Sequence, residues 1–186
     1  MTSAARPMPG RSERASVPDD GEGSLPGSRL ERVESVLAIQ DLKARYAELV
    51  DRRYRDGQVA EPSVVSEAAE AAARLFTEDA TWDGGPRLGR VVGRAAIAER
   101  LRQTTLRFAR HYFVAPRIVL DDRDPGRARG RWELLSPCRD RKGRDFWLCG
   151  VEEDEYERVG GAWLHRSMSM TPVVTAPSEG PWTIHA

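Results

Sequence analysis

The stretch HYFVAPRIVL at residues 111–120 begins the part of the sequence that decides the fold. Apolar and polar side chains alternate here with a period of two, and similar segments return at 128–136, 145–158 and 162–174. Turn-forming residues separate the segments, and the clearest turn is DDRDPG at 121–126. We therefore predict four long strands joined by short turns, as in an antiparallel meander.

Helical patterns occupy the sequence before these strands. Apolar residues recur at helical spacing over 30–54, an alanine-rich helix is expected at 64–76, and a third helix is expected at 94–109. Between the second and third helices, residues 80–82 predict a short strand that ends in a Gly-Gly-Pro turn. Helices first and an antiparallel sheet second is an α+β arrangement.

The two ends of the chain differ from its middle in composition. Residues 1–28 are rich in Pro, Gly, Ser, Arg and Asp and contain few large apolar side chains, so we expect a disordered tail there. The 186 residues otherwise fit one domain, which we place at 29–176, with a C-terminal tail at 177–186.

Charge and composition argue against several classes of function. The chain carries 29 Lys and Arg residues against 29 Asp and Glu residues, which gives no basic surface for nucleic acid. No apolar run approaches the roughly 20 residues needed to span a bilayer, and no secretory signal is visible, so we expect a cytoplasmic protein without a membrane partner.

Cysteine and histidine residues predict neither a disulfide framework nor a metal site. Cys138 and Cys149 form no CxxC motif, and His111, His165 and His185 do not stand at ligand spacing. No metal is therefore expected. Of the three histidines, we interpret His165 and His185 as surface or tail residues without a clear partner.

Several short motifs resemble one known superfamily. They are IQDL at 39–42 leading into Arg45-Tyr46 and Asp51, FTEDATW at 76–82, the pair of segments 150–156 and 161–163, and EGPW at 179–182. Their order and spacing over residues 30–182 resemble the SnoaL-like and scytalone dehydratase-like branch of the nuclear transport factor 2-like superfamily.

This resemblance implies a fold and a kind of chemistry. The fold would be a cone-shaped barrel, in which a curved antiparallel sheet packs on three N-terminal helices around a conical pocket. Most enzymes of the branch need no metal or organic cofactor, so none is expected here. Other members are non-catalytic small subunits, so the fold alone does not decide the function.

Three residues are candidates for catalysis. His111 opens the first long strand, and a histidine can hold or release a proton near neutral pH. The resemblance implies that His111 is a general base, that Asp51 orients it, and that Tyr46 donates a hydrogen bond to a substrate oxygen. The alternatives are a histidine that satisfies only backbone groups, an exposed Asp51 paired with a neighbouring arginine, and a core tyrosine.

Other residues are candidates for the pocket wall. The sequence MSM at 168–170 predicts an apolar pocket floor, whereas Asp83, Glu133 and Asp154 are possible further carboxylates. The aromatic and methionine side chains of the predicted strands are candidates for substrate binding, provided that they face inward. These candidate lining residues are Trp82, Phe113, Trp132, Trp147, Tyr156, Met168 and Met170.

Together these features predict a cofactor-independent acid–base enzyme. We expect a dehydratase, isomerase or cyclase that acts on an apolar polyketide-like or steroid-like metabolite and that forms a homo-oligomer, either a dimer or a trimer. Abundant Arg and Ala suggest a bacterial source with natural-product metabolism. The alternatives are a non-catalytic scaffold, such as the small subunit of a ring-hydroxylating dioxygenase, and a protein that binds a hydrophobic ligand without turnover.

Overall fold

A computed structural model describes residues 28–180 and Trp182. The predicted N-terminal tail lies almost wholly outside these residues, apart from Ser28. Ser28 is the N-cap of the first helix, α1 (Arg29–Asp51). Its hydroxyl accepts from the backbone N–H of Glu31, and the Glu31 carboxylate accepts from the backbone N–H of Ser28. This capping box explains why the helix begins here.

The elements follow the predicted order of helices first and long strands second. After α1 come β1 (Tyr54–Arg55), β2 (Gln58–Val59), α2 (Pro62–Ala73), β3 (Phe76–Asp83), α3 (Gly85–Leu88), β4 (Arg90–Val92), α4 (Arg94–Arg102) and β5 (Phe108–Ala109). The four long strands are β6 (Tyr112–Leu120), β7 (Arg127–Arg139), β8 (Asp145–Val159) and β9 (Ala162–Pro177). The predicted α+β class is confirmed.

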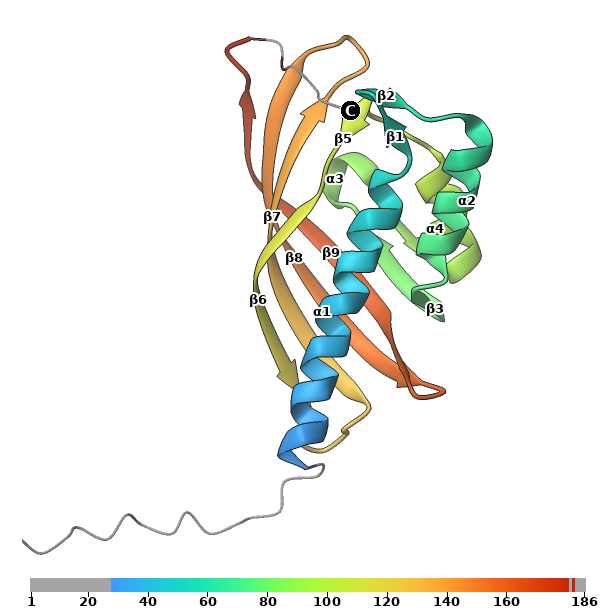
Figure 1. The fold of residues 1–186 in the computed structure, drawn as a ribbon, viewed down its shortest axis with the longest axis vertical. Helices are drawn as coiled ribbons and strands as arrows, with labels where there is room; N and C mark the ends of the chain where they lie inside the picture. The colour runs from blue at the N-terminus through green and yellow to red at the C-terminus, as the bar shows by residue number, and fades with distance from the viewer. Residues whose placement is uncertain (1–27, 181, 183–186) are drawn as a thin grey trace, which may run out of the picture.

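The main sheet has seven strands and curls around the helices (Figure 1). Its order is β4-β3-β9-β8-β7-β5, and β6 also pairs with β7. The meander from β6 to β9 is antiparallel, whereas β3 runs parallel to β9. As predicted, the result is a curved, mostly antiparallel sheet packed against N-terminal helices.

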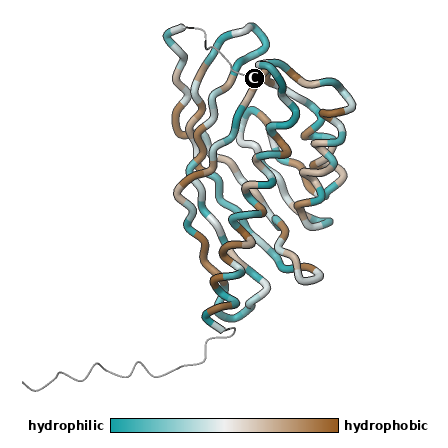
Figure 2. Tube along the Cα trace, in the orientation of Figure 1, coloured by the Kyte–Doolittle hydropathy of each residue, from teal (hydrophilic) through white to brown (hydrophobic). Residues whose placement is uncertain are grey.

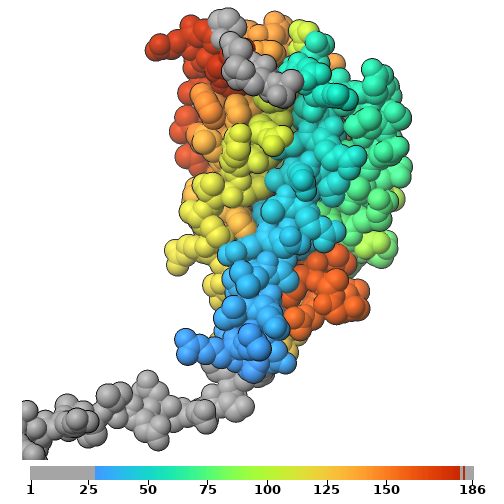
Figure 3. Space-filling view, in the orientation of Figure 1, coloured from blue at the N-terminus to red at the C-terminus, as the bar shows by residue number. Residues whose placement is uncertain are grey.

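The first helix lies in the hollow of the curved sheet. It contacts α2, β6 and β9, and in Figure 3 it runs between the yellow strands and the green helices. Its buried stripe includes Ile39, Leu42, Tyr46 and Val50, which packs on the inner face of the sheet. Figure 2 shows hydrophobic positions alternating with hydrophilic ones along the long strands. None of the described helices is long and apolar enough to cross a membrane.

Three predicted boundaries were wrong. The helix α1 ends at Asp51 rather than at residue 54, and α2 ends at Ala73, so Phe76 begins a strand instead of ending a helix. Phe76 joins the sheet because its backbone pairs with β9. The helix α4 ends at Arg102 rather than at 109, and the chain after it turns into β5. Two β-branched threonines follow this end, and they disfavour a continued helix.

Candidate active site

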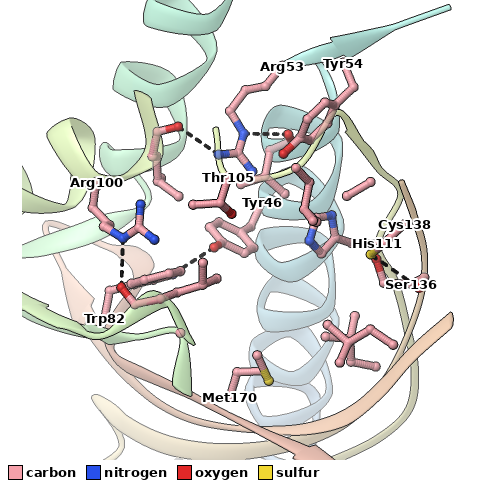
Figure 4. Close-up of a pocket in the computed structure, with 18 of the residues that line it drawn as sticks. Tyr46, Arg53, Tyr54, Trp82, Arg100, Thr105, His111, Ser136, Cys138 and Met170 are labelled. Carbon is pink, nitrogen blue, oxygen red and sulfur yellow. Dashed lines mark hydrogen bonds between the residues drawn. The ribbon is translucent and has the colours of Figure 1, made fainter. Parts of the chain in front are cut away.

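A cavity opens between the C-terminal end of α1, the segment from β3 to α3, and the inner face of the sheet (Figure 4). Its volume is about 100 Å³, and it opens to solvent. Most of the wall is apolar, with a few polar side chains among the apolar ones, as in many small-molecule sites. The principal apolar groups are Val50, Leu88, Leu101, Leu134, Leu148 and Met170.

Asp51 and His111 form a hydrogen-bonded pair at this cavity. Asp51 is the last residue of α1, and His111 directly precedes β6. The Asp51 Oδ1 atom lies 2.7 Å from His111 Nδ1, and both carboxylate oxygens lie 3.2 Å from the His111 backbone nitrogen. Arg110 Nε lies 3.4 Å from Asp51 Oδ2. These donors offset the unfavourable position of a carboxylate at a helix C-terminus.

The pair fixes which ring nitrogen of His111 can act as a base. Because the Asp51 carboxylate accepts from Nδ1–H, the neutral ring carries its lone pair on Nε2. Among the described residues, no group forms a hydrogen bond with Nε2. The side chain of Asp51 is 6% exposed, whereas that of His111 is 22% exposed and lines the cavity. A ligand in the cavity therefore meets a histidine whose free nitrogen can accept a proton.

Tyr46 contributes a protonated phenol to the same cavity. Its hydroxyl oxygen accepts a hydrogen bond of 3.0 Å from Trp82 Nε1, which leaves the hydroxyl hydrogen free to donate. Burial raises the pKa of Tyr46 well above its usual value, and the nearby charge of Glu152 raises it further. The phenol therefore keeps its proton at neutral pH. Figure 4 shows Tyr46, Trp82 and His111 around the cavity.

Five of the seven predicted lining residues lie outside the wall of this cavity, whereas Trp82 and Met170 belong to it. Trp147 is on the outer face of β8, 38% exposed, with its ring centroid 5.4 Å from that of Trp182. Strand phase explains its position, since Phe146 is half-buried and the next side chain points to the opposite face. The other four pack in or beside the core: Phe113, Trp132, Tyr156 and Met168.

A cluster of buried charged residues lies beside the cavity; the sequence analysis named Asp154 as a possible carboxylate but missed Lys43 and Glu152. Lys43, in the middle of α1, is 1% exposed, and its Nζ lies 2.5 Å from Glu152 Oε2 and 2.7 Å from Asp154 Oδ2. Burial alone would lower the pKa of Lys43, but the two carboxylates outweigh that effect and raise it. The Nζ atom also lies 4.2 Å from the centre of the Phe113 ring.

Hydrogen bonds extend this cluster into the core. Asp154 Oδ2 also accepts from the Tyr156 hydroxyl at 2.7 Å, and the Tyr156 oxygen accepts from Trp132 Nε1 at 2.9 Å. Burial raises the pKa of Asp154 to about 6, although the charge of Lys43 opposes the shift. A signal for the cluster exists in the sequence, because residues 152, 154 and 156 share one face of β8. Two acidic groups on a buried face require a cationic partner.

His165 lies in the core, so the prediction of a surface position was wrong. It is 0% exposed, and its ring centre lies 5.0 Å from that of Phe76 and 5.1 Å from that of Tyr156. Burial lowers the pKa of His165 well below 6.5, and the charge of Lys43 acts in the same direction. Its backbone pairs with Phe76 and Tyr156, which places the side chain on the inner face of the sheet.

The remaining candidates have structural partners or lie elsewhere. Asp83 accepts from the backbone N–H of Gly85 at 2.9 Å, and Glu133 pairs with Arg131 at 3.3 Å on the surface. His185 is outside the described residues. Cys138 and Cys149 are free thiols, and burial raises the pKa of Cys138 to about 11. Within residues 28–180 and Trp182, no group of three His, Cys, Asp or Glu side chains could hold a metal ion.

Comparison with known families identifies the chain's relatives. Residues 63–169 match the model of the SnoaL-like domain, which is more than half of the sequence. The chain belongs to the SnoaL-like family. The match covers most of the main sheet and His111, but it begins after α1, which carries Tyr46 and Asp51. No curated protein sequence matches the chain.

Solved structures share the fold at low sequence identity. Hexachlorocyclohexane dehydrochlorinase LinA-type3 from Novosphingobium barchaimii is 20% identical, with a TM-score of 0.69 over 86% of this chain and 100% of that one. A protein provisionally named a scytalone dehydratase, from Novosphingobium aromaticivorans, is 22% identical, with a TM-score of 0.64 over 86% and 95%. A Mycobacterium tuberculosis protein of unknown function is 21% identical, with a TM-score of 0.60 over 79% and 76%. The TM-scores show a common fold.

Proposed function

We propose that this SnoaL-like protein is a cofactor-independent acid–base enzyme that removes a proton from an apolar metabolite. The observation that carries the proposal is the 2.7 Å hydrogen bond between Asp51 and His111 at the wall of a cavity. A base, a carboxylate that orients it and a phenol beside it are sufficient for proton abstraction without a metal or organic cofactor.

Each of the three side chains has a distinct role. His111 Nε2 takes a proton from a carbon next to a carbonyl group or next to the carbon that bears a leaving group. Asp51 holds the ring and stabilises the imidazolium that forms. The Tyr46 hydroxyl donates to the substrate oxygen on which negative charge develops. In a dehydration, the imidazolium of His111 would return its proton to the departing hydroxyl group, which leaves as water. Departure of a halide would complete another elimination, and return of the proton to a different carbon would complete an isomerisation.

Two comparisons support elimination as the reaction type. The names of two structural relatives, a dehydrochlorinase and a provisional scytalone dehydratase, both describe loss of a small leaving group. The apolar wall of the cavity favours a polyketide-like or steroid-like carbon skeleton. Ring closure is a further possibility for the same base, since a cyclase also begins with proton removal.

The outer face of the sheet supports the proposal of a homo-oligomer. One row of cross-strand neighbours runs from β6 through β7 and β8 to β9, so its side chains share one face of the sheet. The row consists of Tyr112, Leu135, Cys149 and Val174. Tyr112 is 49% exposed, Leu135 39% and Val174 50%. An exposed apolar row of this kind is typical of an interface between copies of a chain. Light scattering at micromolar concentration would give the mass, and a monomer would contradict the proposal.

Proton abstraction can be tested without knowing the natural substrate. The ketone 2-tetralone is apolar and bicyclic and has acidic hydrogens next to its carbonyl group. We expect the wild-type protein to accelerate exchange of these hydrogens in D₂O, followed by proton NMR. His111→Ala should lower the catalysed rate by roughly 10²–10⁴ because it removes the base.

A matched control is His165→Leu, which changes a histidine outside the cavity wall and should leave the exchange rate near that of the wild type. Equal rates for the wild type and His111→Ala would contradict the proposal and favour a ligand-binding or scaffold function. If exchange depends on His111 as expected, chloride release from hexachlorocyclohexane and water loss from scytalone would separate the two kinds of leaving group.

A further inference from the structure

Glu152 is a carboxylate in the same cavity that the scheme for proton abstraction does not use. It lies on β8, where its backbone pairs with Trp132 on β7 and Met170 on β9, so its side chain faces inward with theirs. Glu152 lines the cavity together with Tyr46 and His111, although its side chain is only 7% exposed. A buried carboxylate at a ligand cavity is costly unless it is paired and hydrogen-bonded.

The hydrogen bonds of Glu152 are incomplete. Its Oε2 atom accepts from Lys43 Nζ at 2.5 Å. Among the residues that the structure describes, no group donates to Oε1. Because an ionised carboxylate can accept several hydrogen bonds, Oε1 retains the capacity to bind a donor. Such a donor can reach Glu152 from the cavity, where a ligand would lie.

The charge of Glu152 is also only partly balanced. Lys43 is shared with Asp154, so one cation serves two carboxylates. The arginines at the cavity are directed elsewhere: Arg53 donates to the carbonyl oxygens of Val50 and Leu101, and Arg100 donates to that of Leu88. A hydrogen-bond donor on the ligand would complete the environment of this carboxylate.

Asp154 shows why Glu152 is the member of the cluster that meets a ligand. Asp154 lies one inward-facing position further along β8 and is 2% exposed. Its Oδ2 atom accepts from both Lys43 and Tyr156, and it does not belong to the cavity wall. The two carboxylates therefore share the same lysine but differ in access to the cavity.

We propose that Glu152 accepts a hydrogen bond from a hydroxyl group of the ligand and so selects hydroxylated apolar molecules over those that lack the hydroxyl. This inference rests on the proposed function, because it treats the cavity as the substrate site. It adds a substrate class: an apolar skeleton with a hydroxyl at the Glu152 end and an acidic carbon–hydrogen bond at the His111 end. Glu152 is thereby a specificity-determining residue.

A pair of probes tests the inference by binding alone. The compounds 2-naphthol and 2-methylnaphthalene have nearly the same shape, but only the first has a hydroxyl group. We expect the wild-type protein to bind 2-naphthol at least about tenfold more tightly at pH 7, measured by calorimetric or NMR titration. Glu152→Gln should reduce this preference about tenfold, since a neutral amide is a weaker acceptor than a carboxylate.

Asp154→Asn is the matched control, because it removes a carboxylate from the same lysine without changing the cavity wall. It should keep most of the preference, because the Glu152 Oε1 atom stays free to accept from the ligand. Similar affinities of the wild type for the two probes would overturn the inference, and so would equal loss of preference in Glu152→Gln and Asp154→Asn.

The outcome can be separated from that of the proposed function. Binding requires no proton transfer, so His111→Ala should retain the preference for 2-naphthol even though it loses exchange activity. If His111→Ala loses the preference and Glu152→Gln keeps it, the hydroxyl binds at the histidine and the inference fails. Should Glu152→Gln not fold, a crystal structure of the wild type with 2-naphthol decides the matter. A hydroxyl oxygen beyond about 3.2 Å from the Glu152 carboxylate would overturn the inference.

Discussion

The described residues contain two Asp–His pairs, and only Asp51–His111 forms a hydrogen bond. At the cavity, the Asp51 and His111 side chains are 2.7 Å apart, and the histidine side chain is 22% exposed. In the core, Asp154 Oδ2 and His165 Nδ1 are 3.8 Å apart, and both side chains are 0% exposed. The same residue types therefore stand in very different environments.

The difference shows that partners and access, not composition, decide what an Asp–His pair can do. Asp51 directs its carboxylate to the ring and backbone of His111, whereas the Oδ2 atom of Asp154 accepts from Lys43 and Tyr156. Burial keeps His165 neutral and away from any ligand. Proton transfer requires both an orienting acceptor and an accessible lone pair, and only the pair at the cavity combines them here.

The largest expected effect comes from removing the charge of Asp51. Asp51→Asn keeps the size of the side chain but no longer stabilises the imidazolium, so we expect a loss of roughly 10²–10⁴ in the exchange rate. Binding of 2-naphthol should change far less than the rate. The double variant with His111→Ala should be no slower than His111→Ala alone, because the two residues act as one unit. If the rate losses of the two single variants added in the double variant, Asp51 and His111 would not act as one unit, and the contrast with the core pair would fail.

Loss of the buried lysine should affect stability more than any other change in the core. Lys43→Met leaves Glu152 and Asp154 without their cation, and breaking a buried ion pair costs about 3–5 kcal/mol. Urea denaturation would measure the free energy of unfolding. The control on the same helix is Arg45→Met, since Arg45 and Asp41 form an exposed pair at 3.9 Å that contributes under about 1 kcal/mol. Equal losses would show that the core cluster is not needed for stability.

Acid should destabilise the fold through His165. Because its folded-state pKa lies well below its usual 6.5, His165 stabilises the fold above pH 6.5, and that stability is lost as the pH falls below it. His165→Leu should remove this part of the acid dependence, as measured by urea denaturation at pH 8 and pH 5.

Asp154 acts in the opposite direction over this range. Its pKa is raised from 3.8 to about 6, so its contribution is fully present below pH 3.8 and is lost as the pH rises through 6. Asp154 therefore cannot cause a loss of stability on acidification. An unchanged acid dependence in His165→Leu would show that another group is responsible.

The smallest expected effect on the exchange rate comes from removing the hydroxyl group of Tyr46, and Tyr156 provides the comparison. Tyr46→Phe removes the hydroxyl that we place on the substrate oxygen, so the exchange rate should fall by about tenfold. Tyr156→Phe removes a hydroxyl bonded to Asp154 and Trp132 in the core, which should cost about 1–3 kcal/mol of stability and leave the rate nearly unchanged. Comparable rate losses in both variants would indicate that Tyr46 acts through packing alone.

Much of the fold followed from periodicity, because it reports burial directly. Alternation over 128–136 predicted the middle of β7, and the structure extends that strand at both ends to Arg127–Arg139. Helix ends were less predictable, since Phe76 and residues 108–109, which we had placed in helices, pair with distant strands. Such pairing depends on the whole sheet and leaves little local signal.

The candidate site was predictable only in part, for a related reason. Motifs near Asp51 and His111 indicated the pair, yet 60 residues separate them and only the folded sheet brings them into contact. Lys43 was missed because a lysine on a helix usually marks an exposed face. His165 was placed on the surface by the same reasoning, although its strand position made it inward-facing. Sequence patterns therefore misplace polar residues that are buried in the core, where they are paired with an opposite charge or kept neutral.

Gly130 leaves the space that Tyr156, a member of the core cluster, occupies. Its backbone lies against Tyr156, and a β-carbon there would come within 2.8 Å of the tyrosine ring and 3.2 Å of Trp132 Nε1. Any larger residue at position 130 would displace the tyrosine whose hydroxyl donates to Asp154. The side chain at 156 therefore limits the one at 130: relatives that keep a tyrosine at 156 should keep glycine at 130, whereas a small side chain at 156 would leave room for a larger residue there.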